Sequence, residues 1–361
     1  MSFLRRLFGR SEPEHHHSDE PVPGWDAINA ALEPIYGDTE PLHWGTVVRW
    51  RLGGPDPLDG TSAYRADGPP LHWHFVSYGL SELYAKESED PAASGWGIEL
   101  TFRLRREPGD DQPPGWALNL LQNLARYVFE SGNVLRAGDH LDLNGPIVPT
   151  ERTEIRALAF ALDPQLGRIE TPHGSLEFVQ VVGVTMDEYT AMMAWDTLRL
   201  LELIQEQDAL LVTDLERTSY LADPAIAQVV QEGTATEGSS MARINVDRLD
   251  WRGDDDRLSI TLGAMAIERL HRMVEGRLPF GEQLWIQGPE MAVVAQPAEP
   301  FSWHDAGEGV VHIDLPVAMG RAIAESVPPT AGTYDIEPRL RIVVERTVIT
   351  DQDGNSVESV G

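Results

Sequence analysis

The sequence predicts an α/β protein of two lobes, each a mixed β-sheet with flanking helices. The chain has 361 residues, 42% of them hydrophobic, which is more than one typical core accommodates. Segments with an apolar period of two alternate irregularly with segments of period 3.6, as in a mixed sheet and not as in a strict βαβ repeat. The segment Gln231–Ser240 is small and polar, which predicts a boundary between domains at 24–232 and 240–350.

The first domain follows an expected disordered leader, residues 1–23, whose second half is polar, charged and proline-bearing. A helix is predicted over Trp25–Ile35, where apolar residues recur at helical spacing. Strands are predicted from alternating apolar and aromatic runs at Thr46–Leu52, His72–Tyr78, Trp96–Arg105, Glu154–Leu162 and Leu176–Thr185.

Two longer helices are predicted in the same domain. The first begins behind Pro113 and Pro114, because prolines favour helix starts, and Gly132 ends it. The second spans Asp187–Gln207 and keeps one apolar face along its whole length.

The second domain is richer in strands. They are predicted at Ala242–Trp251, Arg257–Leu262, Glu282–Gln287, Met291–Gln296, Val310–Leu315 and Leu340–Arg346, with helices at Ala266–Glu275 and Val317–Ser326. Residues 351–361 are expected to form a tail.

Charge restricts the class of partner. The chain carries 58 acidic and 28 basic residues, a formal net charge of −30, and Lys86 is its only lysine. So acidic a chain repels nucleic-acid phosphates and anionic membranes, and it attracts a basic peptide or protein by long-range steering. The alternative is that the acidity only keeps the protein soluble.

Other compositional features bound the compartment and the chemistry. The absence of cysteine excludes disulfides, thiolate catalysis and iron–sulfur clusters, and it fits a reducing cytoplasm. Arg5 and Arg6 interrupt the N-terminal apolar run, and no run of about 18 apolar residues follows. A soluble, cytoplasmic monomer without a cofactor is expected.

Motifs for common enzymatic chemistry are missing. A P-loop needs a glycine-rich turn ending in lysine, and Lys86 lies between Ala85 and Glu87. The three spaced glycines of a dinucleotide site and the Gly-x-Ser-x-Gly elbow of hydrolases are also absent. Asp351 and Asp353 begin a segment with the composition of a calcium loop, but its glycine falls at the fourth position instead of the sixth.

One metal site remains as an alternative. His72 and His74 are two apart on a predicted strand, so both side chains point to one face and could share an ion with His43 or an acidic residue. A metal-dependent enzyme is therefore the runner-up function. Trp73, Phe75 and Tyr78 favour the opposite interpretation, in which the strand is packed core.

Several long stretches resemble the suppressor of fused family. They are RLGGPDPLDGTSAYR (Arg51–Arg65), LHWHFVSYGLSELY (Leu71–Tyr84), SGWGIELTFRL (Ser94–Leu104), LARYVFESGN (Leu124–Asn133), AGDH (Ala137–His140), TPHGSLEFVQVVGVT (Thr171–Thr185) and EGTATEGSSM (Glu232–Met241). Their order is also that of the family. The resemblance is strong over about residues 40–215 and continues, more weakly, to Val327.

The resemblance implies a protein without enzymatic activity, in which two α/β lobes close on a short peptide that adds as a β-strand. In animals the peptide belongs to Gli transcription factors of Hedgehog signalling. Tyr127 and Asp139 match groove residues of the family, and Ala242–Val246, with Ile244 and Val246, matches the strand where the peptide adds. The alternative is that Tyr127 packs its helix and Asp139 caps a turn.

The chain also departs from the animal proteins. It lacks the long acidic, serine-rich insertion of their second lobe, and arginine almost replaces lysine, which is typical of a GC-rich bacterial genome. Bacteria have no Gli, so the ligand does not carry over. Bacterial members have been proposed as immunity proteins that neutralise toxins, and an acidic two-lobed binder suits a basic toxin.

Overall fold

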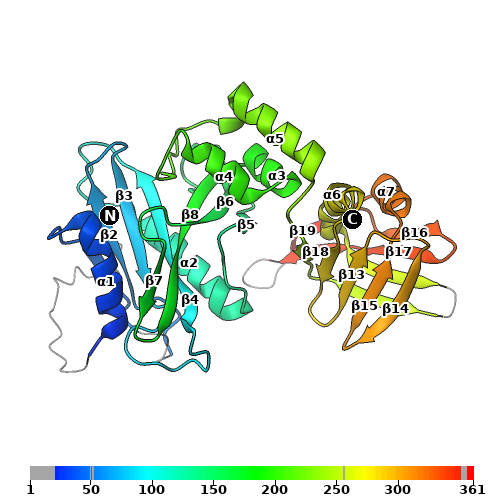
Figure 1. The fold of residues 1–361 in the computed structure, drawn as a ribbon, viewed down its shortest axis with the longest axis horizontal. Coiled ribbons are helices and arrows are strands. Elements are labelled where there is room, and N and C mark those ends of the chain that lie inside the picture. Colours follow the sequence, from blue (N-terminus) through cyan, green and yellow to red (C-terminus); the bar gives the residue numbers. More distant parts are fainter. Residues whose placement is uncertain (1–20, 49, 51–52, 255–256, 351–355) are drawn as a thin grey trace. The chain divides into compact units, whose positions relative to one another are not determined.

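A computed structural model describes residues 21–48, 50, 53–254, 257–350 and 356–361. They form two compact units (Figure 1). Unit 1 comprises Met1–Tyr189 and Thr197–Ala222, and unit 2 comprises Thr190–Asp196 and Asp223–Gly361. None of the described helices combines the length and apolar character that a membrane crossing requires. The mixed α/β class with mixed sheets agrees with the prediction.

Unit 1 is built on an eight-stranded mixed sheet in the order β1-β2-β3-β4-β8-β6-β5, with β7 paired to β8. Its strands are β1 (Leu42–Gly45), β2 (Gly60–Ala66), β3 (His72–Tyr78), β4 (Ala93–Arg105), β5 (His140–Asp142), β6 (Ile155–Leu162), β7 (Arg168–Thr171) and β8 (Gly174–Thr185). The helices are α1 (Pro23–Tyr36), α2 (Gly115–Ser131), α4 (Thr197–Gln205) and the short η3 (Tyr220–Ala222), and α3 (Met186–Ala194) runs from unit 1 into unit 2.

Helices cover both faces of the central strands. The apolar face of α2 packs on Phe75 of β3 and Phe102 of β4, while Ile28 and Leu32 of α1 pack on the opposite face. Every residue of β3 is therefore buried. The predicted helix between Pro114 and Gly132 is confirmed, and Gly132 ends it with a left-handed φ of 72°.

Unit 2 contains a four-stranded sheet, β10-β11-β17-β16, a five-stranded sheet, β14-β15-β13-β12-β9, and the hairpin β18-β19. The strands are β9 (Arg243–Asn245), β10 (Leu249–Gly253), β11 (Leu258–Gly263), β12 (Leu284–Gln287), β13 (Ala292–Gln296), β14 (Ser302–Gly307), β15 (Val310–Asp314), β16 (Gly332–Glu337), β17 (Leu340–Glu345), β18 (Thr347–Thr350) and β19 (Ser356–Val360). The helices are α5 (Pro224–Glu237), η4 (Ala264–Ala266), α6 (Ile267–Arg277), η5 (Leu278–Phe280) and α7 (Val317–Ser326).

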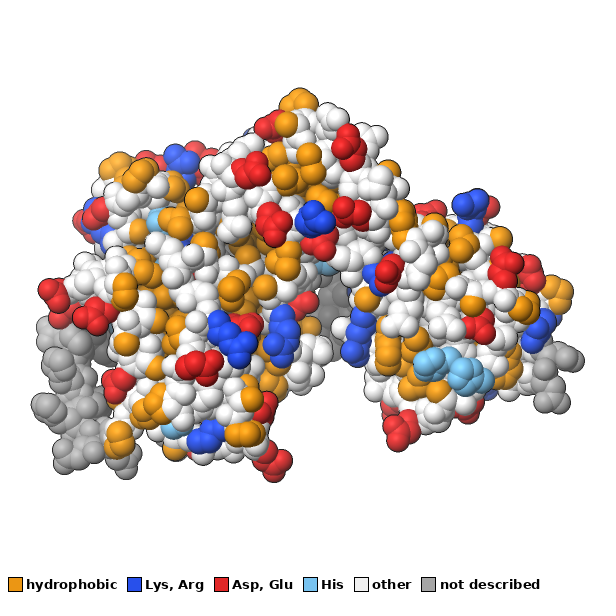
Figure 2. Space-filling model, viewed as in Figure 1, with side chains coloured by type: hydrophobic (Ala, Val, Ile, Leu, Met, Phe, Trp, Pro, Cys, Tyr) orange, Lys and Arg blue, Asp and Glu red, His pale blue; other side chains and the backbone are white. Residues whose placement is uncertain are grey.

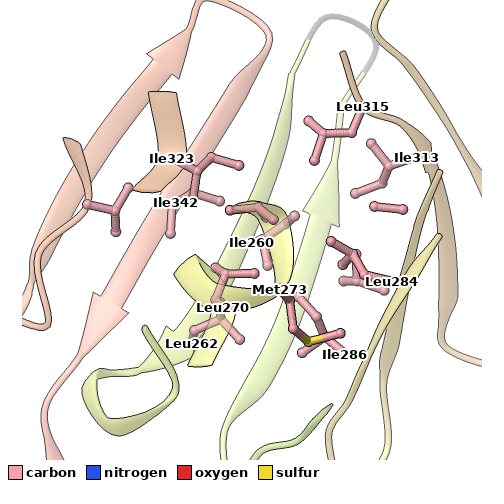
Figure 3. Close-up of a cluster of buried hydrophobic side chains, with 14 of the residues drawn as sticks. Ile260, Leu262, Leu270, Met273, Leu284, Ile286, Ile313, Leu315, Ile323 and Ile342 are labelled. Carbon is pink, nitrogen blue, oxygen red and sulfur yellow. The ribbon is translucent and has the colours of Figure 1, made fainter. Parts of the chain in front are cut away.

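One apolar core joins the two larger sheets of unit 2 (Figure 3). Leu270 and Met273 of α6 share it with Ile260 of β11, Ile286 of β12 and Ile342 of β17. Burying side chains of this size contributes about 1.5–3 kcal/mol each. The core therefore fixes both sheets, including the position of β9 at the edge of one of them.

Three predicted elements are wrong in the described residues. In the predicted strand Thr46–Leu52, the described residues 46–48 and 50 form no strand: β1 ends at Gly45, and Thr46 Oγ1 donates to Leu58 O at 2.6 Å. The predicted helix Asp187–Gln207 is broken at Trp195–Asp196, because residues 190–196 pack within unit 2 and α4 packs within unit 1. Ala242–Trp251 divides into β9 and β10, which lie in different sheets.

The chain ends and the expected boundary also differ in detail from the sequence pattern. The units divide at Asp223, and α5 covers the first part of the small, polar segment Gln231–Ser240. Asp223 caps α5 through its side chain, which accepts from the Ala225 N–H at 2.9 Å. Most of the predicted leader, residues 1–20, lies outside the described residues, as does the calcium-like segment 351–355. The end of the predicted tail forms β19.

Candidate peptide-binding surfaces

The β9 strand lies at the end of its sheet and pairs with β12 on one side only. The pairing is parallel, with Ile244 opposite Ile286. The Trp285 N–H donates to Ala242 O and the Val246 N–H donates to Gln287 O, both at 2.8 Å. In the described part of the chain no strand lies on the other side of β9. β9 is therefore an open sheet edge, and it coincides with the segment where the sequence predicts strand addition.

Alternate residues of β9 have different roles. Ile244 and Val246 are 3% and 6% exposed and belong to the unit 2 core, so their side chains hold the strand in place. Because the backbone groups at 242, 244 and 246 face β12, those of Arg243 and Asn245 face the open side. Sequence reasoning missed these two residues, since which groups are free follows only from the pairing.

Tyr127 lies on α2 of unit 1 and is half-buried against the core. Its hydroxyl accepts from Asn133 Nδ2 at 3.3 Å, and its carbonyl accepts from the Ser131 hydroxyl at 2.6 Å. The side chain therefore both packs the helix and presents a polar tip. The surrounding structure supports the packing interpretation and leaves the hydroxyl at the surface.

Asp139 follows α2 in a tight turn and is exposed. One carboxylate oxygen, Oδ2, accepts from the Arg136 N–H at 2.7 Å, which is the turn-capping contact. The carboxylate makes no ion pair with any residue of the described segments, so its charge is available to a ligand. The neighbouring His140 is half-buried: burial lowers its pKa, and the charge of Asp139 opposes that shift.

Unit 1 also carries exposed apolar side chains at Val47, Val48 and Trp50, the last of which adjoins the half-buried pair Trp96 and Phe129. Val47 is 94% exposed and Trp50 is 40% exposed. The rings of Trp50 and Trp96 each meet Phe129 edge-on, with centroids 5.5 Å apart. The apolar side chains of Val47, Val48 and Trp50 led to the strand prediction at Thr46–Leu52. Clustered exposed apolar side chains are typical of protein-binding surfaces.

Charge does not gather into one continuous acidic field on the visible face. Figure 2 shows acidic and basic side chains interspersed there. The net charge of −30 therefore acts as a long-range attraction for basic partners, while local contacts decide where they bind.

His72 and His74 lie at alternate positions of β3, on one face as predicted, and both are buried. His74 Nδ1 lies 2.8 Å from the Tyr36 hydroxyl, and its Nε2 lies 3.3 Å from Asp163 Oδ2. The Nδ1 of His72 donates to Pro70 O at 2.7 Å. Burial, together with the charge of Arg103, lowers the pKa of His74 to about 4. His74 is therefore hydrogen-bonded through Nδ1, while its Nε2 lies beside Asp163 without a hydrogen bond of its own.

The partners of His74 belong to a buried polar network. Arg103 donates to Asp163, Gln165 and Gln180, and the Thr101 hydroxyl donates to Asp163 Oδ2 at 2.7 Å. Although burial alone would raise it, contacts with His74 and Arg103 hold the pKa of Asp163 well below its usual range. Within the described residues, no group of three or more His, Cys, Asp or Glu side chains is placed to hold a metal ion.

Two more buried carboxylates fix the chain between β3 and β4. Glu99 accepts from the N–H groups of Gly79 and Ser81 at 2.8 and 2.9 Å, and burial raises its pKa to about 7. Glu82 accepts from several N–H groups and lies 3.0 Å from the Lys86 ammonium. These contacts outweigh the effect of burial and lower the pKa of Glu82 to about 2. Both groups serve loop structure.

Comparison with known proteins identifies related chains. A family model described as Suppressor of fused protein (SUFU) matches residues 54–218. The Suppressor of fused homologs of Homo sapiens and Mus musculus are each 36% identical over 264 residues, which is 66% of this chain and 54% of theirs. The chain thus spans about half the length of these relatives.

Solved structures of suppressor of fused proteins are also similar to this chain. Drosophila Suppressor of Fused superposes with a TM-score of 0.75 over 90% of this chain and 97% of its own, at 24% identity, which shows a shared fold. A chain of the Sufu–Fu complex is 34% identical, with a TM-score of 0.55 over 59% of this chain and 98% of its own.

Proposed function

The chain belongs to the suppressor of fused family, and from this we propose that it is a non-enzymatic binding protein that sequesters a peptide or protein partner. The open edge of β9 is the observation that carries the proposal. A related chain forms the Sufu–Fu complex, which is an assembly of proteins. An extended partner segment adds to β9 through backbone hydrogen bonds.

Unit 1 supplies the second part of the proposed binding surface. Asp139 offers an exposed carboxylate without an ion-pair partner in the described segments, and Tyr127 offers a hydroxyl at the surface. A cationic side chain of the partner pairs with Asp139, and the surface around Tyr127 contributes apolar contact. We further propose that both units hold the partner, as the resemblance to the family implies.

The proposed partner is basic. The chain's charge of −30 raises the association rate of a cationic protein and disfavours acidic competitors. In a bacterial host, a basic toxin that must be kept inactive would have the positive charge expected of the partner. On that basis we propose an immunity function.

Affinity capture from the source organism, followed by titration of the captured partner, tests the function. The wild-type chain is compared with Asp139→Arg and with Asp38→Arg, a matched charge reversal at an exposed position of the same unit. Reversal at Asp139 is expected to weaken binding by about 2–4 kcal/mol if it breaks a desolvated pair, while Asp38→Arg binds as wild type. Equal affinity of all three proteins, each folded by circular dichroism, would remove Asp139 from the site.

A further inference from the structure

Unit 2 contains a pocket of about 230 Å³ just beyond β9. It opens at the carboxyl ends of β11 and β17, which run parallel and end side by side at Gly263 and Glu345. Ligands of α/β proteins commonly bind beyond the carboxyl ends of parallel strands. Its lining includes Val246, Arg248, Met265, Arg269, Glu345 and Arg346.

Three arginines line this pocket in a chain whose net charge is −30. Arg248 Nε donates to Glu345 at 2.9 Å, and Arg346 Nε donates to Gly361 O at 3.0 Å. Arg269 makes no hydrogen bond or ion pair within the described residues. The terminal nitrogens of all three guanidinium groups thus have no partner in the described part of the chain.

Basic side chains outnumber acidic ones in the lining of the pocket. Asp247 and Glu345 stand against three arginines, and Arg269 has no ion pair in the described residues. Charges more than about 8 Å away are largely screened at physiological salt. A planar guanidinium fork matches the two oxygens of a carboxylate or phosphate. Exposed Met265 adds an apolar wall for the carbon part of such a ligand.

We propose that the pocket binds an oxyanion, carboxylate or phosphate, carried by a side chain of the partner segment. That this oxyanion belongs to the segment added along β9 rests on the proposed function. The link is Val246, which directly follows β9 and also lines the pocket. A strand added along β9 and continuing past Asn245 brings a side chain to it. The site selects, among basic partners, those with one anionic side chain at this register.

Direct titration tests the pocket without any partner. The probes are N-acetyl-O-phosphoserine N-methylamide and N-acetylaspartate N-methylamide, added to protein with isotope-labelled arginine while Nε–H NMR signals are followed. We expect saturable shifts of the Arg269 and Arg248 signals with half-saturation at about 1–10 mM. The stronger of the two probes identifies the oxyanion. Absence of saturable shifts with both probes would overturn the proposal.

Two variants make the titration specific. Arg269→Gln is expected to abolish the saturable shift of the Arg248 signal, whereas Arg252→Gln, at a side chain that is 86% exposed on β10, leaves it unchanged. Loss in both variants, or in neither, would contradict a pocket site.

A double-mutant cycle with a captured partner tests the register. Neutralising the partner's acidic or phosphorylated side chain is expected to weaken binding to the wild type about tenfold or more and to leave binding to Arg269→Gln unchanged. If the probes bind but this coupling is absent, the pocket stands and its link to β9 is wrong. If the partner binds without any need for β9, the proposed function fails instead.

Discussion

Arg103 Nη1 lies 2.6 Å from Asp163 Oδ2, and neither side chain reaches solvent. The pair joins β4 to the end of β6 across β8, which lies between them in the sheet. Gln180 of β8 also accepts from Arg103. A buried pair of this kind does little for stability compared with apolar packing, but removing one member leaves an uncompensated charge.

Asp163→Asn is therefore expected to lower the free energy of unfolding by about 3–5 kcal/mol. Urea denaturation followed by circular dichroism measures the loss. Asp38→Asn, at an exposed position, is the control and should lie within about 0.5 kcal/mol of wild type. The double variant Arg103→Met, Asp163→Leu should recover part of the loss. A single variant as stable as the control would mean that Arg103 is solvated by other means.

Glu99 predicts a pH dependence of stability. Burial raises its pKa from 4.5 to about 7, so between these values the native state holds a proton that the unfolded state has released. Its contribution is complete below pH 4.5 and is lost as the pH rises through 7, by up to about 3 kcal/mol.

The difference in unfolding free energy between wild type and Glu99→Gln, measured by urea denaturation across this range, isolates that contribution. It should change by up to the same amount in favour of the variant as pH rises. His74, whose pKa is lowered to about 4, acts with the opposite sign and cancels in the comparison. Parallel stability curves for the two proteins would show that Glu99 is already ionised at pH 5.

Asn245→Pro tests strand addition on β9. The proline removes an N–H that faces away from β12, so the pairing within unit 2 keeps its hydrogen bonds. Captured partner is expected to bind about tenfold or more weakly, since a backbone hydrogen bond and close strand approach are both lost. Asn245→Ala keeps the N–H and should bind normally in the same titration. Equal weakening by both variants would assign the effect to the side chain.

Replacing Gly233 with alanine is expected to destabilise the protein, although alanine usually stabilises a helix. Gly233 lies in α5, where an added Cβ would stand 2.2 Å from Cε2 of Trp195. Alanine normally favours a helix by about 1 kcal/mol over glycine, but overpacking here should turn this into a net loss of about 1–3 kcal/mol. Thermal unfolding with tryptophan fluorescence measures it. Gly115→Ala in α2 has open space around the new Cβ and should not destabilise; a Gly233→Ala protein matching it would contradict the packing.

The local pattern of the sequence was sufficient for the regular elements. His72–Tyr78 and Val317–Ser326 are predicted with the bounds that the structure has, because periodicity and flanking residues agree there. The pattern could not show that Trp195 interrupts a helical run, since that break follows from the residue's packing in unit 2.

The candidate sites, too, could be predicted from the sequence only in part. The sequence places His72 and His74 on one face, but Asp163 and Arg103 reach them only through the strand order of the sheet. The segment Ala242–Val246 followed from family resemblance. That Arg243 and Asn245 present the open backbone, and that Arg269 lines a pocket nearby, required the pairing with β12 and the end of β11.

Lys86 is the only lysine of the chain, and its ammonium contacts Glu82, Ser88 and the carbonyl of Ala93. An acylating reagent that forms stable amides therefore meets a single side-chain amine in this sequence. Because that nitrogen must first leave its three partners, the labelling rate reports how readily these contacts break. Lys86 can thus serve as a chemical probe of the segment in which it lies. Slower acylation of Lys86 in the presence of a partner would show that binding protects it.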